Sequence, residues 1–306
     1  MTDRHLDRRS VLRLAAAGGA LAALGAPGRA AARGPESPRS RKLKKAVKYG
    51  MVREGDSVLA KFQLLRELGF DGVELDSPSD LDLDEVLAAK AETGLEVPGV
   101  VDSVHWAKPF SHPDAAVRAE GVAALETALR DCKKVGGTSV LVVPALVNGG
   151  VRYDDAYRRS QEEIARCVPL AEELDVRIAF ENVWNNFLLS PLEAARYVDE
   201  FDSDHVGFHF DIGNIVLYGW PAQWIEILGP RIFKLDVKDY SRKKLDDEGR
   251  WAGFGVQIGE GDADWPAVMK ALDAIGYEGW AAAEVSGGGR DRLAQIAANM
   301  DKVFAS

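Results

Sequence analysis

The sequence predicts a closed (β/α)8 barrel, the TIM-barrel architecture, and two features of its pattern carry the prediction. From Ala46 onward, short apolar runs alternate with segments that have the period of an amphipathic helix, and there are eight of each. Such units form a parallel sheet, and a count of eight favours a closed barrel over an open doubly wound sheet. No break in composition divides residues 46–306, so a single domain is expected.

The expected strands and helices alternate strictly. Several helical segments open on Ser, Asp or Pro and close on Gly, which are residues that start and end helices. The expected strands are residues 46–52, 71–75, 96–101, 139–145, 177–182, 206–213, 232–238 and 280–285. The expected helices are residues 57–69, 82–94, 114–137, 154–175, 190–202, 221–229, 264–276 and 291–305.

Residues 1–32 do not follow this pattern. Arg8 and Arg9 precede an Ala-, Leu- and Gly-rich stretch that ends in three alanines. This arrangement predicts a cleavable signal for twin-arginine export, and therefore a periplasmic or secreted protein. The apolar stretch is too short and too rich in Gly for a good spanning helix, so no stable membrane insertion is expected after cleavage; an uncleaved anchor is the alternative. Residues 33–45, rich in Pro, Ser and Arg, are expected to form a disordered linker.

The charge balance excludes one class of partner. The chain carries a formal charge of -10, and the five Arg and two Asp of the signal segment contribute +3, which leaves -13 for the rest. An acidic protein repels phosphate backbones, so nucleic acid is not an expected partner. Two cysteines, Cys132 and Cys167, are too few for a disulfide scaffold. They fall on neighbouring expected helices, so one bridge is one interpretation and two buried thiols the other.

Polar residues gather where the expected strands end, which is where barrels build their sites. They are Glu74, Asp76, Asp102, His105, Trp106, Glu181, Asn182, Asp211, Asn214, Asp236, Lys238, Asp239 and Glu284. Glu181, Asp211, Asp236 and Glu284 lie on strands five to eight at corresponding positions. Neighbouring strands are about 5 Å apart, so these carboxylates would repel one another unless protonated or bound to a cation.

A divalent metal ion would remove this repulsion. Oxygen-only ligands favour a hard ion such as Mn²⁺ or Mg²⁺, and Co²⁺ also fits. For each carboxylate taken alone, a solvated or salt-bridged strand end is the alternative interpretation.

Several motifs together resemble the xylose isomerase-like TIM-barrel family of sugar isomerases and epimerases. They are "HWAKPFSHPDAAVRAEGV", "FENVWNNFLLSP", "FHFDIGN", "FKLDVKDY", "IGEGDADWPAV" and "AAEV", and the resemblance covers nearly all of residues 46–306. It implies that Glu181 and Glu284 both hold the metal and move protons, and that Asp211 is a ligand. Asp236 stands where the epimerases usually have His and the xylose isomerase branch has Asp. Asn214 stands where several epimerases have a substrate-contacting His, which leaves the substrate open.

The resemblance implies chemistry on a small carbohydrate. The metal would chelate a carbonyl and a neighbouring hydroxyl and stabilise an enediolate, while one glutamate takes a proton and the other gives one. With a leaving group β to the carbanion, the same site would act as a dehydratase or 3-keto-glycoside lyase. A sugar-binding barrel without turnover is disfavoured by the Glu181/Glu284 pair. An endonuclease IV-like enzyme is disfavoured because it needs many histidines and the chain has five.

The remaining expectations concern substrate contacts. The candidates are Glu74, His105, Trp106, Asn182, Asn214, Lys238 and Glu260. Trp106 is a sugar-stacking wall or a barrel cap, and Lys238 binds a substrate oxygen or neutralises the carboxylates. Glu260 is a substrate contact or a loop-ordering residue. His209 is an interior hydrogen-bonded residue or a further ligand. Residues 286–290, "SGGGR", form a phosphate site or a flexible turn. The oligomeric state is open, a homo-oligomer included.

Overall fold

The structure is a computed structural model that describes residues 41–306. The predicted signal segment lies outside these residues, and twin-arginine export stays a prediction. The first strand, β1 (Leu43–Lys48), begins inside the range expected to be linker. It does so because Leu43 pairs with Gly279 of the last strand, and because Arg41 forms an ion pair with Asp273.

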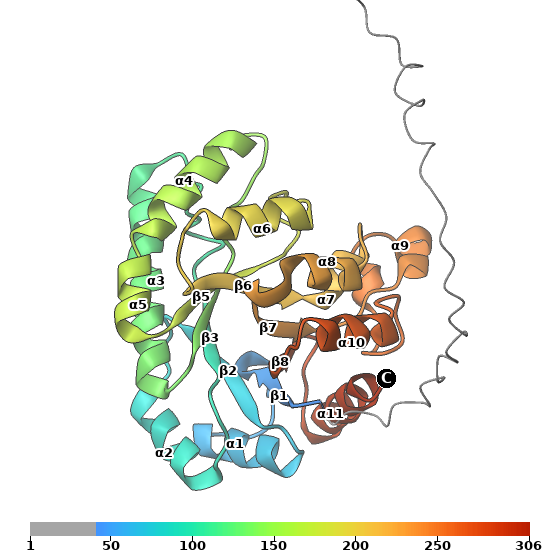
Figure 1. The fold of residues 1–306 in the computed structure, drawn as a ribbon. Coiled ribbons are helices and arrows are strands. Elements are labelled where there is room, and N and C mark those ends of the chain that lie inside the picture. The colour runs from blue at the N-terminus through green and yellow to red at the C-terminus, as the bar shows by residue number, and fades with distance from the viewer. Residues whose placement is uncertain (1–40) are drawn as a thin grey trace, which may run out of the picture. The chain divides into compact units, whose positions relative to one another are not determined.

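The eight strands form a closed parallel barrel in chain order, as the sequence predicts, with helices around it (Figure 1). The other strands are β2 (Gly72–Ser77), β3 (Gly99–Asp102), β4 (Ser139–Val142), β5 (Arg177–Glu181), β6 (Val206–Asp211), β7 (Ile232–Val237) and β8 (Gly279–Ala283). The helices are α1 (Val58–Glu67), α2 (Leu83–Thr93), α3 (Ala115–Val135), α4 (Tyr153–Ala165), α5 (Val168–Leu174), α6 (Pro191–Asp199), α7 (Ile212–Val216), α8 (Pro221–Leu228), α9 (Arg242–Glu248), α10 (Trp265–Ala274) and α11 (Arg290–Phe304).

Three helical features differ from the expected pattern. The expected helix 154–175 is two helices, α4 and α5, because Pro169 starts a new helix and cannot continue the old one. Two short helices, α7 and α9, follow β6 and β7 and were not expected. Both stand at the C-terminal ends of their strands, so both bear on the site.

The hydrophobic core fills the space between the strands and the surrounding helices. Strand residues Val47, Val73, Val140 and Ile178 are fully buried in it. Both cysteines are free, buried thiols, so the alternative without a bridge holds. Within residues 41–306, no helix is both long enough and apolar enough to cross a membrane.

One irregularity of the barrel matters for the site. The pairing of β6 with β7 shifts its register between Phe208 and His209. Beyond the shift, His209 pairs with Lys234 and Asp211 pairs with Asp236. Residues two apart on a strand point to the same side, so the register stacks two polar levels in the barrel, with the first of these pairs below the second.

Candidate active site

Four carboxylates from four consecutive strands meet at the C-terminal end of the barrel. Glu181 and Asp211 end β5 and β6, Asp236 lies near the end of β7, and Glu284 directly follows β8. One oxygen atom from each lies within 4.8 Å of one from every other. Three of the side chains are buried, and that of Glu284 is 35% exposed. The structure therefore brings together the residues predicted as metal ligands and as the acid–base pair.

Two asparagines hold these carboxylates in place. The Asn182 side chain donates to the backbone carbonyl of Asp211 at 2.7 Å and accepts from its backbone N–H at 2.9 Å. Asp211 caps helix α7 by accepting the N–H of Asn214 at 2.8 Å. The Asn214 amide then donates to Glu181 Oε1 at 3.3 Å. Predicted as substrate contacts, Asn182 and Asn214 are used here to orient Glu181 and Asp211.

Lys238 lies within this outer group of carboxylates. Its Nζ atom is 2.6 Å from Asp211 Oδ2 and 2.5 Å from Glu284 Oε2. Gly213 makes room for its side chain, since a Cβ atom at that position would lie 2.5 Å from Lys238 Cγ. The lysine predicted to neutralise the carboxylates or bind substrate is therefore in contact with the carboxylates.

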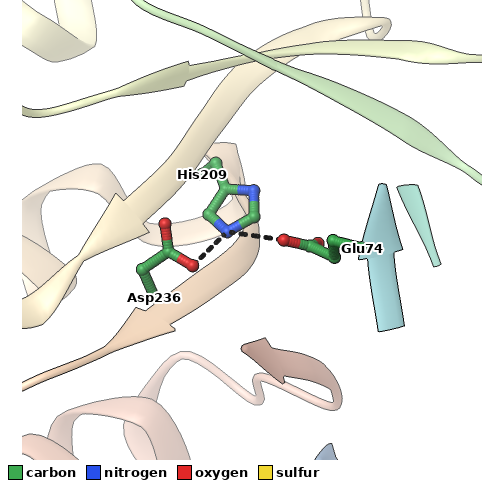
Figure 2. A group of neighbouring side chains, drawn as sticks. All are labelled: Glu74, His209 and Asp236. Carbon is green, nitrogen blue, oxygen red and sulfur yellow. Dashed lines mark ion pairs between the residues drawn. The ribbon is translucent and has the colours of Figure 1, made fainter. Parts of the chain in front are cut away.

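A second ionic level lies beneath the first. Lys48 Nζ bridges Glu74 Oε2 at 2.6 Å and Asp236 Oδ1 at 2.8 Å. His209 Nε2 is 3.0 Å from Asp236 Oδ1 and 4.0 Å from Glu74 Oε2. Figure 2 shows the imidazole ring between these two carboxylates. Lys234 lies 3.6 Å from Glu74 Oε1. Glu74, predicted as a substrate contact, is 3% exposed and is occupied by these partners.

The pKa values follow the placement of these charges. Burial raises the pKa of Glu181 well above its usual value, and the charge of Glu284 raises it further. Burial also raises the pKa of Asp211 to about 7, against the lowering effect of Lys238. Burial by itself would raise the pKa of Asp236, but the nearby His209 and Lys48 outweigh this effect and hold the pKa below its usual value. The surroundings of Asp236 thus favour its ionised form, whereas burial favours the protonated forms of Glu181 and Asp211.

The donor set fits a divalent cation. The two levels contain five carboxylates, on Glu74, Glu181, Asp211, Asp236 and Glu284, and three lysines, Lys48, Lys234 and Lys238. When ionised, these carboxylates outnumber the lysines, and a divalent ion would reduce this excess of negative charge. Asp236 Oδ2 is buried without a hydrogen-bond partner among residues 41–306. These oxygen donors suit a hard ion.

The inner group of Glu74, His209 and Asp236 also lies within metal-ligand reach. Two lysines already contact its carboxylates, Lys48 both of them and Lys234 that of Glu74. Its charges are therefore balanced without an ion, and we assign it as a buried ion-pair network. His209 is buried within this network and approaches Asp236, but neither of its ring nitrogens has a hydrogen-bond partner among residues 41–306.

A cavity of about 310 Å³ opens beside Glu284. Lys238, Phe254, Ser286 and Arg292 are among its lining residues. Sequence reasoning missed Arg292, which forms no ion pair within residues 41–306 and donates to Gln257 and to the Ser286 carbonyl. Two larger hollows, of about 740 and 890 Å³, lie elsewhere and are lined by none of the four carboxylates.

An aromatic cluster adjoins this cavity through Phe254, one of the residues that line it. The Trp184 ring stacks on Phe254 with centroids 4.8 Å apart, and its indole N–H donates to the Asn214 carbonyl at 2.9 Å. The centroid of the Trp251 ring is 5.1 Å from that of Trp184, and Trp251 is 73% exposed. The segment between β7 and α10, which carries Phe254 and Trp251, therefore packs on the loop after β5.

The other predicted contacts lie outside the group of four carboxylates. His105 is buried, and burial lowers its pKa to about 4, with a further lowering by Lys48. Trp106 is 50% exposed and contacts His105 edge-on. Glu260 is exposed and accepts the Gln257 N–H at 3.3 Å, which is the loop-ordering role.

The glycine-rich turn before α11 does not offer an anion site, which was one of the two interpretations of its sequence. A carboxylate oxygen of Glu54 accepts the backbone N–H of Arg290 at 2.7 Å, at the start of the helix. The Arg290 guanidinium pairs with Glu67 at 2.8 Å and approaches Glu54 at 3.7 Å. The helix N-terminus and the arginine are thus already occupied by carboxylates of this chain.

Asp102, at the end of β3, is expected to make stability depend on pH. Burial raises its pKa to about 6, and Oδ2 has no hydrogen-bond partner among the described residues. A raised pKa contributes stability below about pH 4 that is lost as the pH rises through about 6. Asp102→Asn cannot ionise, so its free energy of unfolding should rise relative to wild type by about 2–3 kcal/mol between pH 4 and pH 8. Urea denaturation at both pH values measures this, and an unchanged difference would contradict it.

Comparison with known proteins places the chain in a family. A family model described as xylose isomerase-like TIM barrel matches residues 62–304. The chain belongs to the xylose isomerase-like TIM-barrel family. It is 28% identical over 257 residues to the L-ribulose-5-phosphate 3-epimerase UlaE of Escherichia coli O1:K1, covering 78% of this chain and 86% of the relative.

Solved structures share the fold of this xylose isomerase-like barrel. The 3-keto-D-glucoside 4-epimerase YcjR from E. coli aligns with a TM-score of 0.72 and 19% identity, covering 87% of this chain and 100% of that chain. The IOLI protein, solved with a bound zinc atom, aligns with a TM-score of 0.70 and 19% identity, covering 86% of this chain and 98% of that chain. At these identities the two structures bear on the fold alone.

Proposed function

We propose that this protein is a divalent-metal-dependent isomerase or epimerase of a ketose or keto-sugar, with Glu181 and Glu284 as its acid–base pair. The observation that carries the proposal is the convergence of two glutamates from β5 and β8 in one group of four carboxylates. The group borders a cavity of about 310 Å³, which has room for a small carbohydrate. The relatives in the family that are named as carbohydrate epimerases support an epimerase or isomerase activity.

Glu181, Asp211, Asp236 and Glu284 would hold the metal, for which Mn²⁺, Mg²⁺ and Co²⁺ are the candidates. When bound, the ion would supply positive charge to stabilise the negative charge that develops on the substrate oxygens. Asn182 and Asn214 would keep Asp211 and Glu181 oriented for this task.

The two glutamates are suited to different parts of a proton transfer. Glu284 reaches the cavity, where it can take the proton from the carbon beside the substrate carbonyl. Glu181 is buried, and its raised pKa favours the protonated form, which suits the group that gives a proton. Because the two come from strands on different sides of the barrel mouth, they can address opposite faces of a substrate held between them, as epimerisation requires.

The charged side chains around the cavity indicate which class of substrate should be tested first. In the turn of residues 286–290, for which a phosphate site was one interpretation, Glu54 already accepts the Arg290 N–H, while Arg292 lines the cavity and hydrogen-bonds to neutral partners. We therefore propose hydroxyl-rich keto-sugars as the first class to test, and sugar phosphates as the second, with Arg292 as the group that would meet the phosphate.

Deuterium exchange tests the proposal directly. The full chain, stripped of metal by a chelator, is incubated in D₂O with each ketose or keto-glycoside, with and without Mn²⁺, and followed by NMR. Mn²⁺-dependent deuterium incorporation beside the carbonyl, with an epimer or isomer as product, is the expected result. Exchange that leads to an eliminated sugar would instead support the lyase alternative. Metal binding without exchange on any substrate of either class would count against the proposal.

A further inference from the structure

We propose that Lys238 is a resident counter-ion of the carboxylate group, which a divalent cation must displace in order to bind. The proposal rests on the metal dependence proposed above. Once displaced, the ammonium would face the substrate cavity that the lysine already lines.

The position of the ammonium carries the proposal. Its nitrogen lies 2.6 Å from Asp211 Oδ2 and 2.5 Å from Glu284 Oε2, two members of the four-carboxylate group. A hard divalent ion needs such oxygens at about 2.0–2.6 Å. The ammonium and a metal therefore require the same oxygen atoms and nearly the same volume, so the two cannot be bound together.

The fold holds Lys238 in this position. Gly213 lacks a side chain where a Cβ would lie 2.5 Å from Lys238 Cγ and 2.9 Å from the Lys238 carbonyl oxygen. The nitrogen also lies 5.4 Å from the centroid of the Phe254 ring, within reach of a cation–π interaction. Gly213 thus leaves room for the side chain, and Phe254 adds a contact at its nitrogen.

Two lysines bridge pairs of carboxylates, Lys48 and Lys238, and we propose displacement by the metal ion for Lys238 alone. Lys48 also joins two carboxylates, Glu74 and Asp236, but it does so on the inner level and is not among the residues that line the cavity beside Glu284. Lys238 lines the cavity beside Glu284 and can swing into it. The same side chain would then fulfil both roles considered for it from the sequence, first neutralising the carboxylates and then contacting a substrate oxygen.

Mn²⁺ affinity tests this displacement. Isothermal titration calorimetry of the metal-stripped full chain would compare wild type with Lys238→Met, which keeps the length of the side chain and removes its charge. The matched control is Lys244→Met, whose ammonium donates to the Gly255 carbonyl and forms no ion pair within residues 41–306. We expect Lys238→Met to bind Mn²⁺ at least about tenfold more tightly than wild type, a difference of about 1.4 kcal/mol, and Lys244→Met to bind like wild type.

Thermal unfolding gives an independent readout. Without metal, Lys238→Met should melt below wild type because its carboxylates have lost their counter-ion, and saturating Mn²⁺ should reduce that gap. Lys238→Gln, which keeps a polar end group, should show the same gain in affinity if Lys238→Met folds poorly. Equal or weaker Mn²⁺ binding by the neutral variants would overturn the displacement alone. Failure of wild type and variants to bind Mn²⁺ would overturn it together with the proposed metal dependence.

Discussion

Glu181→Gln and Glu284→Gln are each expected to lower the rate of deuterium exchange and of product formation by about 10²- to 10⁴-fold. Glutamine keeps the shape of the side chain but cannot accept or give the proton. Because both residues also belong to the proposed metal group, Mn²⁺ affinity must be measured on the same samples. A rate that stays low at saturating Mn²⁺ assigns the loss to proton transfer.

Glu260→Gln is the matched control for these variants. Its carboxylate is exposed and contacts a backbone N–H of its own loop, so the change should leave turnover near wild type. If Glu284→Gln turned over as fast as Glu260→Gln, the acid–base role of Glu284 would have to be abandoned. A variant that exchanged deuterium without forming product would separate the residue that removes the proton from the residue that returns it.

Lys48→Met is expected to cause the largest loss of stability. Lys48 bridges Glu74 and Asp236, which are 3% and 0% exposed, and its loss leaves buried carboxylates short of a counter-ion. Breaking a buried ion pair from one side costs about 3–5 kcal/mol in the free energy of unfolding. Guanidinium denaturation at pH 7, monitored by circular dichroism, measures the change.

Two further variants define the origin of that loss. Lys42→Met removes an exposed pair with Glu278 and should cost less than about 1 kcal/mol. The double variant Lys48→Met with Glu74→Gln removes one of the stranded charges and should recover part of the loss. If Lys48→Met were as stable as Lys42→Met, the inner network would not hold the barrel together as described.

The barrel and the outer carboxylates could be predicted because both follow from a repeat. Regular alternation fixes the direction of every strand, and Glu181, Asp211, Asp236 and Glu284 each stand at or next to a strand end. Parallel strands bring such ends to one rim without any knowledge of side-chain packing. The predicted fold was confirmed, and the four residues do meet.

The ion pairs of the inner level were harder to predict from the sequence than the outer carboxylates. Lys48 looks like an ordinary solvent-facing lysine at the end of the first strand, and nothing local shows that it reaches across to Asp236. Lys234 could have been predicted to face the barrel interior. It stands two residues before Asp236 and four before Lys238, so it shares their side of β7. The hydrogen bond from the Arg290 N–H to Glu54 in the glycine-rich turn could not be predicted either, because the two residues are remote in sequence.

The pairing of β1 with β8 has a consequence for how the barrel is made. Leu43 pairs with Gly279, so the first strand lacks one of its two neighbours until nearly the whole chain has been synthesised. Contacts between such distant residues form slowly, and until they form the edges of β1 and β7 are exposed to other chains. A chain shortened before β8 would therefore be prone to aggregate, even though it still carries Glu181, Asp211 and Asp236.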